Sequence, residues 1–345
     1  MRAKNAALLT GACLLLTACT DNNRPRGELV YVSNEDSGDL SVIAAASNEV
    51  VATVPVGKRP RGVRVSPDGR TVYVALSGSP KCPPWMSEED CAAQDTDKSL
   101  DGIAVVDVAT RKLVRILPGG SDPETFDLSR DGTMLFVSNE DAGLASIVDN
   151  ARGEVVKTVT VGEEPEGVRT SPDGKLVYVT GETDHNVTVI ETATGDARAQ
   201  IPVGHRPRDA AFSSDSRLAF VTSEIDGTVS VIDVEHDEVM KTITLPQGSR
   251  SMGVLVGVDN KKLFVSNGRS GTVSVVDLAT DQVVASIEVG PRPWGIALTT
   301  DGRKLYTANG PSNDVTVVDT ETFEVLDRIA VGESPWGIAI GPATP

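Results

Sequence analysis

The length, composition and charge of the chain limit its partners. Its 345 residues include 49 Asp and Glu against 32 Lys and Arg, so the formal net charge is −17 at pH 7. An acidic surface repels phosphate backbones, and we expect no nucleic-acid partner. The charge either steers a basic protein or a cation towards the chain or serves solubility alone.

An export signal is expected at the N-terminus. Arg2 and Lys4 precede an apolar stretch over residues 6–16, which is the pattern of a signal peptide. The stretch is shorter than the roughly 20 residues that a membrane-spanning helix needs. Loss of the two cations with the signal would change the formal net charge from −17 to −19.

The end of this signal resembles the lipobox of bacterial lipoproteins, in the residues Leu16-Thr17-Ala18-Cys19. The resemblance implies that residues 1–18 are removed and that Cys19 is lipidated as the new N-terminus. Thr20 stands where Asp would retain a lipoprotein at the inner membrane, which implies the outer membrane. We expect a periplasmic lipoprotein that touches the membrane through its anchor alone, with residues 19–27 as a polar tether.

Seven copies of one pattern follow over residues 28–345. The recurrence is marked by an aromatic residue in the same strand context, at spacings of 42 to 63 residues: Tyr31, Tyr73, Phe136, Tyr178, Phe220, Phe264 and Tyr306. Each copy holds four short alternating stretches, and Ser66-Pro67-Asp68-Gly69 is a turn signal between two of them. The pattern predicts four β-strands in every copy.

A four-stranded unit of this size cannot bury both of its faces alone, so the units must stack. The sequence therefore predicts an all-β fold, a single seven-bladed β-propeller of four-stranded antiparallel blades. An open β-solenoid and a pair of β-sandwiches are the alternatives. Because the body begins with a strand like the second one of a copy and ends with one like the first, Gly337 to Ile340, we expect a composite closing blade and a monomer.

One copy carries an insert at about residues 78–101, in a loop that would overhang the channel mouth. Cys82 and Cys91 lie in it, and two cysteines in one exported loop favour a disulfide. No metal is expected there, because two thiolates supply only half of a tetrahedral site. With Trp85 between them, the insert is predicted to be a disulfide-pinned lid.

Several segments resemble the YVTN family of β-propeller repeats, among them Tyr31-Val32-Ser33-Asn34, Tyr178-Val179-Thr180 and Pro293-Trp294-Gly295. The resemblance covers nearly the whole body and implies the fold more than a function. Tyr73 to Pro80, followed by the insert, is similar to a seven-repeat subgroup associated with quinone-dependent alcohol catabolism. The C-x-x-C-H motif of c-type haem and the adjacent cysteines of quinoprotein dehydrogenases are missing, so we expect no cofactor.

The loop that enters each copy carries a Gly-x-x-Pro-x segment whose variable residues should surround the channel mouth. The candidate ligand- or partner-binding residues are Arg59, Arg61, His205, Arg206, Arg208, Arg292, Trp294 and Trp336. A basic mouth of this kind suits a small anionic or aromatic ligand, with Arg61 and Arg208 serving capture and not stability. The alternative is that arginines pair with carboxylates of neighbouring blades, as Asp127 could with Arg64 and Arg169, and that the tryptophans pack over the channel as plugs.

No nucleophile–base pair, metal cluster or phosphate loop is visible, and we expect a noncatalytic binding or scaffold module without catalytic residues. Its partner would be a periplasmic protein or a small ligand. The alternative function is a propeller hydrolase or lactonase with a divalent metal, for which Asp122, Glu164 and Glu166 are the candidate carboxylates. His205 alone among the histidines is expected on the ligand face, as a solvated residue or a general base.

Overall fold

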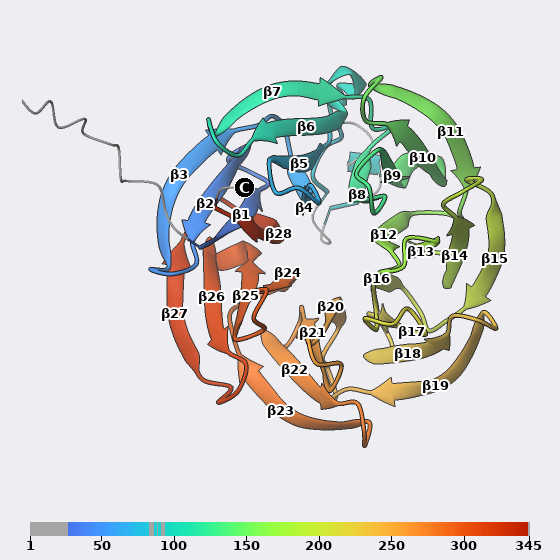
Figure 1. The fold of residues 1–345 in the computed structure, drawn as a ribbon, viewed down its shortest axis with the longest axis vertical. Coiled ribbons are helices and arrows are strands. Elements are labelled where there is room, and N and C mark those ends of the chain that lie inside the picture. Colours follow the sequence, from blue (N-terminus) through green and yellow to red (C-terminus); the bar gives the residue numbers. More distant parts are fainter. Residues whose placement is uncertain (1–26, 83–85, 88, 91–93, 344–345) are drawn as a thin grey trace, which may run out of the picture.

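A computed structural model describes residues 27–82, 86–87, 89–90 and 94–343, which form a ring of seven four-stranded antiparallel sheets around a central channel (Figure 1). The predicted seven-bladed propeller is confirmed, and the solenoid and sandwich alternatives are wrong. We number the blades 1 to 7 in chain order, with the composite blade as blade 1. Cys19, Trp85 and Cys91 lie outside the described residues.

Each blade runs from an inner strand beside the channel to an outer strand at the perimeter. The inner strands, from blade 1 to blade 7, are β28 (Pro335–Pro342), β4 (Pro60–Val65), β8 (Pro123–Leu128), β12 (Pro165–Thr170), β16 (Pro207–Phe212), β20 (Ser251–Val256) and β24 (Pro293–Leu298). The second strands are β1 (Glu28–Asn34), β5 (Thr71–Leu76), β9 (Met134–Asn139), β13 (Leu176–Gly181), β17 (Leu218–Ser223), β21 (Lys262–Asn267) and β25 (Lys304–Asn309).

The third strands are β2 (Asp39–Ala44), β6 (Gly102–Asp107), β10 (Leu144–Asp149), β14 (Asn186–Glu191), β18 (Thr228–Asp233), β22 (Thr272–Asp277) and β26 (Asp314–Asp319). The outer strands are β3 (Glu49–Pro55), β7 (Lys112–Leu117), β11 (Glu154–Thr160), β15 (Ala197–Pro202), β19 (Glu238–Thr244), β23 (Gln282–Glu288) and β27 (Val325–Ala330). The described elements also include 3-10 turns: η1 (Lys98–Leu100), η2 (Glu140–Ala142) and η3 (Gly310–Ser312). Among the described residues, no helix has the length and apolar character to cross a membrane.

Burial falls from the middle of each blade to its outer edge. The second and third strands are buried on both faces because a neighbouring blade covers each face, and the marker aromatics Tyr178 and Tyr306 are fully buried. Outer strands are mostly exposed; in β3 only Val54 is buried. As predicted, the seven marker aromatics occupy equivalent strands: each lies in the second strand of its blade.

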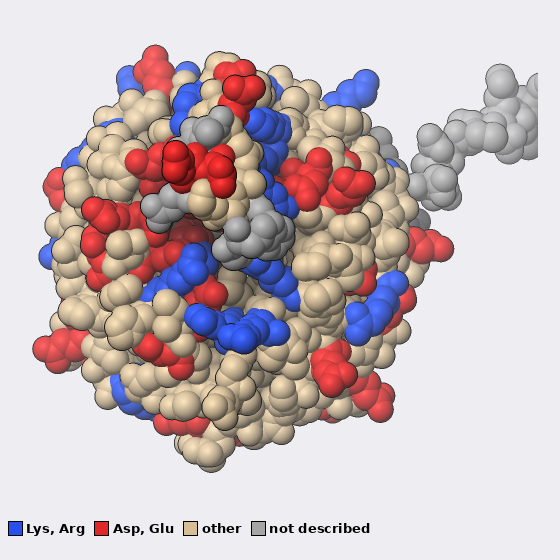
Figure 2. Space-filling model, turned by 180° about the vertical axis from the view of Figure 1, so that it is seen from behind, with Lys and Arg blue, Asp and Glu red and all other residues tan. Residues whose placement is uncertain are grey.

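The turn between the inner and second strands has the predicted chemistry. Gly69 adopts φ of +70° and its N–H donates to the carbonyl of Ser66 at 2.8 Å, while the Ser66 hydroxyl donates to Asp68 at 2.6 Å. These turns lie at the end of the channel opposite to the loops that lead into the inner strands. Figure 2 views the face that carries those entry loops.

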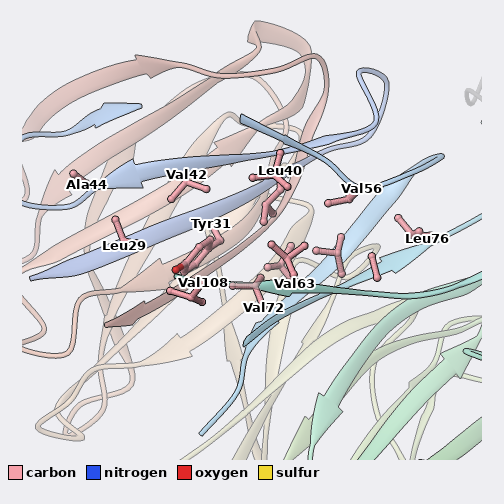
Figure 3. Close-up of a cluster of buried hydrophobic side chains, with 14 residues drawn as sticks. Leu29, Tyr31, Leu40, Val42, Ala44, Val56, Val63, Val72, Leu76 and Val108 are labelled. Atoms are coloured by element: carbon pink, nitrogen blue, oxygen red, sulfur yellow. The ribbon is translucent and has the colours of Figure 1, made fainter. Parts of the chain in front are cut away.

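The ring closes through the predicted composite blade. Strand β28, from the C-terminal end, pairs with β1, from the N-terminal end, and Val30 lies opposite Ile340. The closed blade packs on blade 2 through a cluster of buried aliphatic side chains that includes Leu29, Val63 and Val72 (Figure 3). The pairing covers the facing edges that β1 and β28 would otherwise expose, so the two ends of the chain stabilise each other.

We expect truncation after Trp336 to destabilise the whole ring. The change removes most of β28, exposes the edge of β1 and uncovers the clusters on both sides of blade 1. The measurement is the midpoint of thermal unfolding followed by circular dichroism. Truncation after Ala343 is the control and should leave the midpoint unchanged; equal stability of the two truncated chains would contradict the role of closure.

Candidate functional site

Three positions of every blade meet at the entry-loop end of the channel. The entry residues directly precede the inner strand: Arg59, Asp122, Glu164, Arg206, Arg250, Arg292 and Ser334. The mouth residues are second in the inner strand: Arg61, Glu124, Glu166, Arg208, Met252, Trp294 and Trp336. The rim residues directly follow the second strand: Glu35, Ser77, Glu140, Glu182, Glu224, Gly268 and Gly310.

All seven entry residues have the same backbone conformation. Their φ angles lie between 44° and 61°, in the left-handed region that non-glycine residues adopt uncommonly. Because the loop geometry is constant around the ring, a change of residue at this position changes the side chain presented to the mouth and not the path of the chain.

A glycine, a hydroxyl or both contact the carbonyl of each mouth residue. In blade 7, a Cβ on Gly295 would lie 2.7 Å from the carbonyl oxygen of Trp336, so only glycine allows the two inner strands to approach this closely. In blade 6, the Ser266 hydroxyl donates to the carbonyl of Trp294 at 2.8 Å. The backbones of the mouth residues are therefore fixed by the next blade, and their side chains are free to differ.

The mouth encloses a cavity of about 400 Å³. Its lining includes twelve charged residues and two tryptophans. The charged residues are Glu35, Arg59, Arg61, Lys81, Glu124, Glu140, Glu164, Glu166, Glu182, Arg206, Arg208 and Arg292, and the tryptophans are Trp294 and Trp336. Figure 2 shows basic and acidic side chains together around the hollow at the centre of this face. The expected basic mouth is therefore wrong, because carboxylates of the rim residues balance the arginines.

Arg61 is buried inside a group of carboxylates from blade 3. Its guanidinium lies 2.6 Å from Asp122 and 2.9 Å from Glu140, and it also contacts Glu124. The side chain of Arg61 is only 3% exposed. These contacts cross from blade 2 to blade 3, so Arg61 is a structural tie between blades.

Arg208, in blade 5, makes the corresponding contacts with carboxylates of blades 4 and 5. It lies 2.6 Å from Glu182 and 2.7 Å from Glu224, and it contacts Glu166 in blade 4. Its side chain is 6% exposed. The expectation that Arg61 and Arg208 serve capture and not stability does not fit this structure, since each is occupied by three carboxylates. We call the mouth and rim residues of blades 2 to 5 the paired sector.

The excess of carboxylates in the paired sector favours proton uptake. Burial, to which the charge of Glu182 adds, raises the pKa of Glu166 from 4.5 to about 8 in spite of Arg208. Burial likewise raises the pKa of Glu140 to about 7, although Arg61 opposes the shift. At neutral pH the two glutamates therefore carry protons for part of the time.

Blades 6, 7 and 1 give the mouth a different chemistry, and we call this part the aromatic sector. Trp294 and Trp336 stack with ring centroids 5.2 Å apart and an angle of 24° between the rings. The guanidinium of Arg292 lies 5.2 Å from the centre of the Trp294 ring. The rim residues on this side are Gly268 and Gly310, which carry no side chain.

The other predicted binding residues have separate positions. Arg59 pairs with Glu35 at 3.0 Å, and Arg206 pairs with Glu182. His205 is exposed, lies 3.0 Å from Asp226 and does not line the cavity. The structure thus brings seven of the eight predicted binding residues to one cavity and leaves His205 outside it.

The insert approaches the mouth as predicted, at least in its described part. Lys81 and Cys82 line the cavity, and Arg59 donates to the carbonyls of Ser79 and Pro80 at 2.9 and 2.8 Å. Because Trp85 and Cys91 lie outside the described residues, the lid and its disulfide stay predictions.

Deeper in the channel, Asp127 forms a direct ion pair with only one of the two arginines that it was predicted to neutralise, although its charge also acts on Arg169. Arg64 contacts Asp127 at 3.2 Å, but Arg169 contacts Asp209 at 2.9 Å. Asp209 stands in β16 where five other blades have glycine, so it reaches the arginine of the preceding blade. The pairs link blades in sequence around the channel.

The candidate carboxylates for metal-assisted hydrolysis are not grouped. Asp122 contacts Arg61, Glu166 contacts Arg208, and Glu164 accepts a hydrogen bond from Thr183 at 2.5 Å. In the described part of the chain, no group of three or more His, Cys, Asp or Glu has a metal-binding arrangement. The donor set therefore gives a divalent metal no evident position.

Sequence reasoning missed the acidic rim residues, although a signal for them exists. A glutamate directly follows the second strand in four blades, as in Asn34-Glu35, Asn139-Glu140 and Ser223-Glu224. The recurrence of this glutamate one residue beyond the strand places it at the mouth. The repeat alignment alone would have supplied the missing partners of the arginines.

We expect Arg208→Ala to lower the free energy of unfolding by about 3–5 kcal/mol, because it removes a buried guanidinium that contacts three carboxylates and leaves buried Glu166 without its cation. The measurement is chemical denaturation at neutral pH. Arg206→Ala is the matched control; its side chain is 40% exposed and we expect a loss of no more than about 1 kcal/mol. Similar losses in both variants would show that burial of the pair is unimportant.

We also expect stability to fall between pH 5 and pH 8. Glu166 has a raised pKa in the folded chain, so the folded state binds a proton that the unfolded state has released, and this advantage is lost as the pH rises towards 8. One such group gives a slope of at most about 1.4 kcal/mol per pH unit. The fall in stability should be shallower in Glu166→Gln. It should be unchanged in Glu164→Gln, the control, since Glu164 is an exposed residue of the same blade. If Glu166→Gln has the same slope as the native chain, proton binding by Glu166 is not the cause of the fall.

Comparisons with known proteins agree with the repeat architecture. The profile of the YNCE-like β-propeller family matches residues 173–343, slightly less than half of the chain. No curated protein matches this chain.

Solved structures share the fold at low sequence identity. The periplasmic gluconolactonase of Pseudomonas aeruginosa aligns with a TM-score of 0.72 and 21% identity over 92% of this chain and 99% of that chain. A functionally unknown protein from Desulfotomaculum acetoxidans aligns with a TM-score of 0.75 and 16% identity over 91% and 99%. Kuenenia stuttgartiensis hydrazine synthase aligns with a TM-score of 0.69 and 20% identity over 81% and 88%. This chain is a seven-bladed propeller of repeated blades, similar over its C-terminal half to the YNCE-like β-propeller family.

Proposed function

We propose that this chain is a noncatalytic binding propeller of the periplasm, anchored by a lipid on Cys19, which takes a small ligand or a segment of a partner protein at the channel mouth. The observation that carries the proposal is the division of the mouth. The paired sector uses its arginines and carboxylates on one another, whereas Trp294, Trp336 and Arg292 border the same cavity without such ion pairs among the described residues.

The size and lining of the cavity support binding of a small molecule. A volume of about 400 Å³ falls within the range of small-ligand pockets. An aromatic wall with a few charged groups gives affinity through burial and orientation through hydrogen bonds. A disulfide between Cys82 and Cys91 would hold the insert beside this cavity, where Lys81 and Cys82 already lie.

The resemblance to the subgroup associated with quinone-dependent alcohol catabolism supports a binding role in periplasmic alcohol oxidation. In that setting the chain would act as an accessory, either by holding a product or a quinone or by holding a dehydrogenase. The lipid anchor would keep this activity at the outer membrane.

A lactonase is the second candidate, because the periplasmic gluconolactonase of Pseudomonas aeruginosa shares the fold. The raised pKa of Glu166 also suits a general acid or base. Two observations oppose this candidate. Arg208 contacts the Glu166 carboxylate, and the described residues contain no cluster of metal donors.

The experiment fills the mouth with a side chain. Gly310→Trp places an indole in the cavity, and the nearest atom to an added Cβ is the Pro335 carbonyl oxygen at 3.6 Å, so the backbone need not move. Calorimetry with the chain from residue 20 should detect binding from a panel of gluconate, benzoate, 4-hydroxybenzoate and pyrroloquinoline quinone. We expect Gly310→Trp to abolish this binding without lowering the unfolding midpoint.

Ile225→Trp is the matched control, since this side chain is 53% exposed and does not line the cavity. It should bind like the native chain. Absence of binding by every panel member, or equal binding in both variants, would contradict a ligand site at the mouth. Hydrolysis of glucono-δ-lactone above the spontaneous rate, lost in Gly310→Trp and in Glu166→Gln, would replace the binding proposal with the lactonase.

A further inference from the structure

One cation at the mouth has no carboxylate partner. Among the arginines that line the cavity, Arg59, Arg61, Arg206 and Arg208 all form ion pairs, and Arg292 forms none with any described residue. Its nearest aromatic contact is Trp294. Arg292 is exposed to solvent at the edge of the cavity, and its five guanidinium N–H donors make no hydrogen bond with a described residue.

The surroundings of Arg292 leave its charge uncompensated. Partial burial lowers its pKa, and the neighbouring charge of Arg208 lowers it further, against a weaker attraction from Glu224. Glu224 itself contacts Arg208 at 2.7 Å and is therefore already shared. An anion placed beside Arg292 would relieve this repulsion, which is the electrostatic condition for an anion site.

An aromatic wall of two indoles lies next to this cation. Trp294 and Trp336 line the cavity, and the Trp294 ring contacts Trp336 as well as the guanidiniums of Arg208 and Arg292, at 5.4 and 5.2 Å from its centre. The rim residue of the same blade is Gly310, followed by Pro311. A planar ring can pack on an indole in offset or edge-on geometry and gains about 0.5–1.5 kcal/mol beyond burial. A cation and an aromatic wall side by side match a ring that bears a carboxylate, because the guanidinium fork binds carboxylates in two parallel hydrogen bonds.

The side of the cavity away from Arg292 favours hydrogen-bond donors over anions. Glu124, Glu140 and Glu166 line it, and their contacts with Arg61 and Arg208 leave more carboxylates than cations. Glu140 and Glu166 are partly protonated at neutral pH, and a second anionic group there would meet the carboxylate charge that remains, whereas a hydroxyl or amino group would find hydrogen-bond acceptors. The cavity is therefore polarised from Arg292 to the glutamates.

We propose that Arg292, Trp294 and Trp336 form a subsite for an aromatic carboxylate, whose carboxylate binds Arg292 and whose opposite end carries a hydrogen-bond donor. This assignment rests on the proposed function of the mouth as a ligand site and names the class of ligand. It also separates Arg292 from the buried arginines, which hold the blades together.

The test compares four probes by calorimetry with the chain from residue 20: 4-hydroxybenzoate, benzoate, terephthalate and benzamide. We expect 4-hydroxybenzoate to bind most tightly, and both benzamide and terephthalate to bind about tenfold or more weakly. Benzamide keeps the ring and loses the charge, and terephthalate places a second carboxylate against the glutamates. Equal binding of benzamide and 4-hydroxybenzoate, or no binding of any carboxylate, would overturn the proposal.

Two arginine variants locate the anion. Arg292→Ala should weaken 4-hydroxybenzoate about tenfold or more, and Arg292→Lys should restore part of the loss. Arg250→Ala is the matched control, since Arg250 is the entry residue of blade 6, has the same left-handed backbone and does not line the cavity. It should bind within about twofold of the native chain.

The outcomes distinguish the subsite from the general proposal. If Gly310→Trp abolishes binding and Arg292→Ala does not weaken it, the mouth is a ligand site and the subsite at Arg292 is wrong. If Gly310→Trp leaves binding intact, the proposal that the mouth is the ligand site is wrong. Unfolding midpoints of all variants, measured without probe, show that the comparison concerns folded chains.

Discussion

The hydroxyl of Ser33 joins the two ends of the ring at the point where the mouth is built. It donates to the carbonyl of Arg61 at 2.5 Å and accepts from the N–H of Gly337 at 2.9 Å, so blade 1 holds the inner strand of blade 2 and its own C-terminal inner strand together. With the pairing of β1 and β28, this contact closes the channel. Loops that are hundreds of residues apart in sequence converge on one cavity only because the circle is closed.

The closed ring then imposes a cost on its charged mouth residues. Removing a carboxylate or a guanidinium from water is unfavourable unless the partner and its hydrogen bonds are in place. Blades 3 and 4 present glutamates at the mouth, and Arg61 and Arg208 reach them from the two flanking blades. Since each arginine serves three carboxylates, protonation of Glu140 and Glu166 offsets the remaining repulsion. The contacts between blades in the paired sector therefore depend on pH.

Much of the fold and less of the site could be predicted from the sequence. The fold follows from features that repeat, such as the marker Tyr178 and the turn at Ser66, and repeated features report an average geometry. The site depends on departures from the repeat. Arg61 reaches forward to blade 3 and Arg208 reaches back to blade 4, and nothing in the spacing of these residues sets the direction. One of the two exceptions at the glycine position, Asp209, likewise decides the partner of an arginine in the blade before it.

The division of the mouth into a paired and an aromatic sector also favours a binding function over a catalytic one. A carboxylate that acts as base or nucleophile must reach the substrate, but Glu166 is buried against Arg208, and its reaction with a ligand would require that contact to open. Trp294 and Trp336 form no ion pair, although the Trp294 ring contacts the Arg208 guanidinium at 5.4 Å. Ser266 holds the carbonyl of Trp294, and the close approach of Gly295 fixes the backbone at Trp336. Side chains in the aromatic sector can therefore vary with the ligand at little cost to the ring. This freedom is what a binding module needs, and it lies on the side of the mouth where Arg292 is unpaired among the described residues.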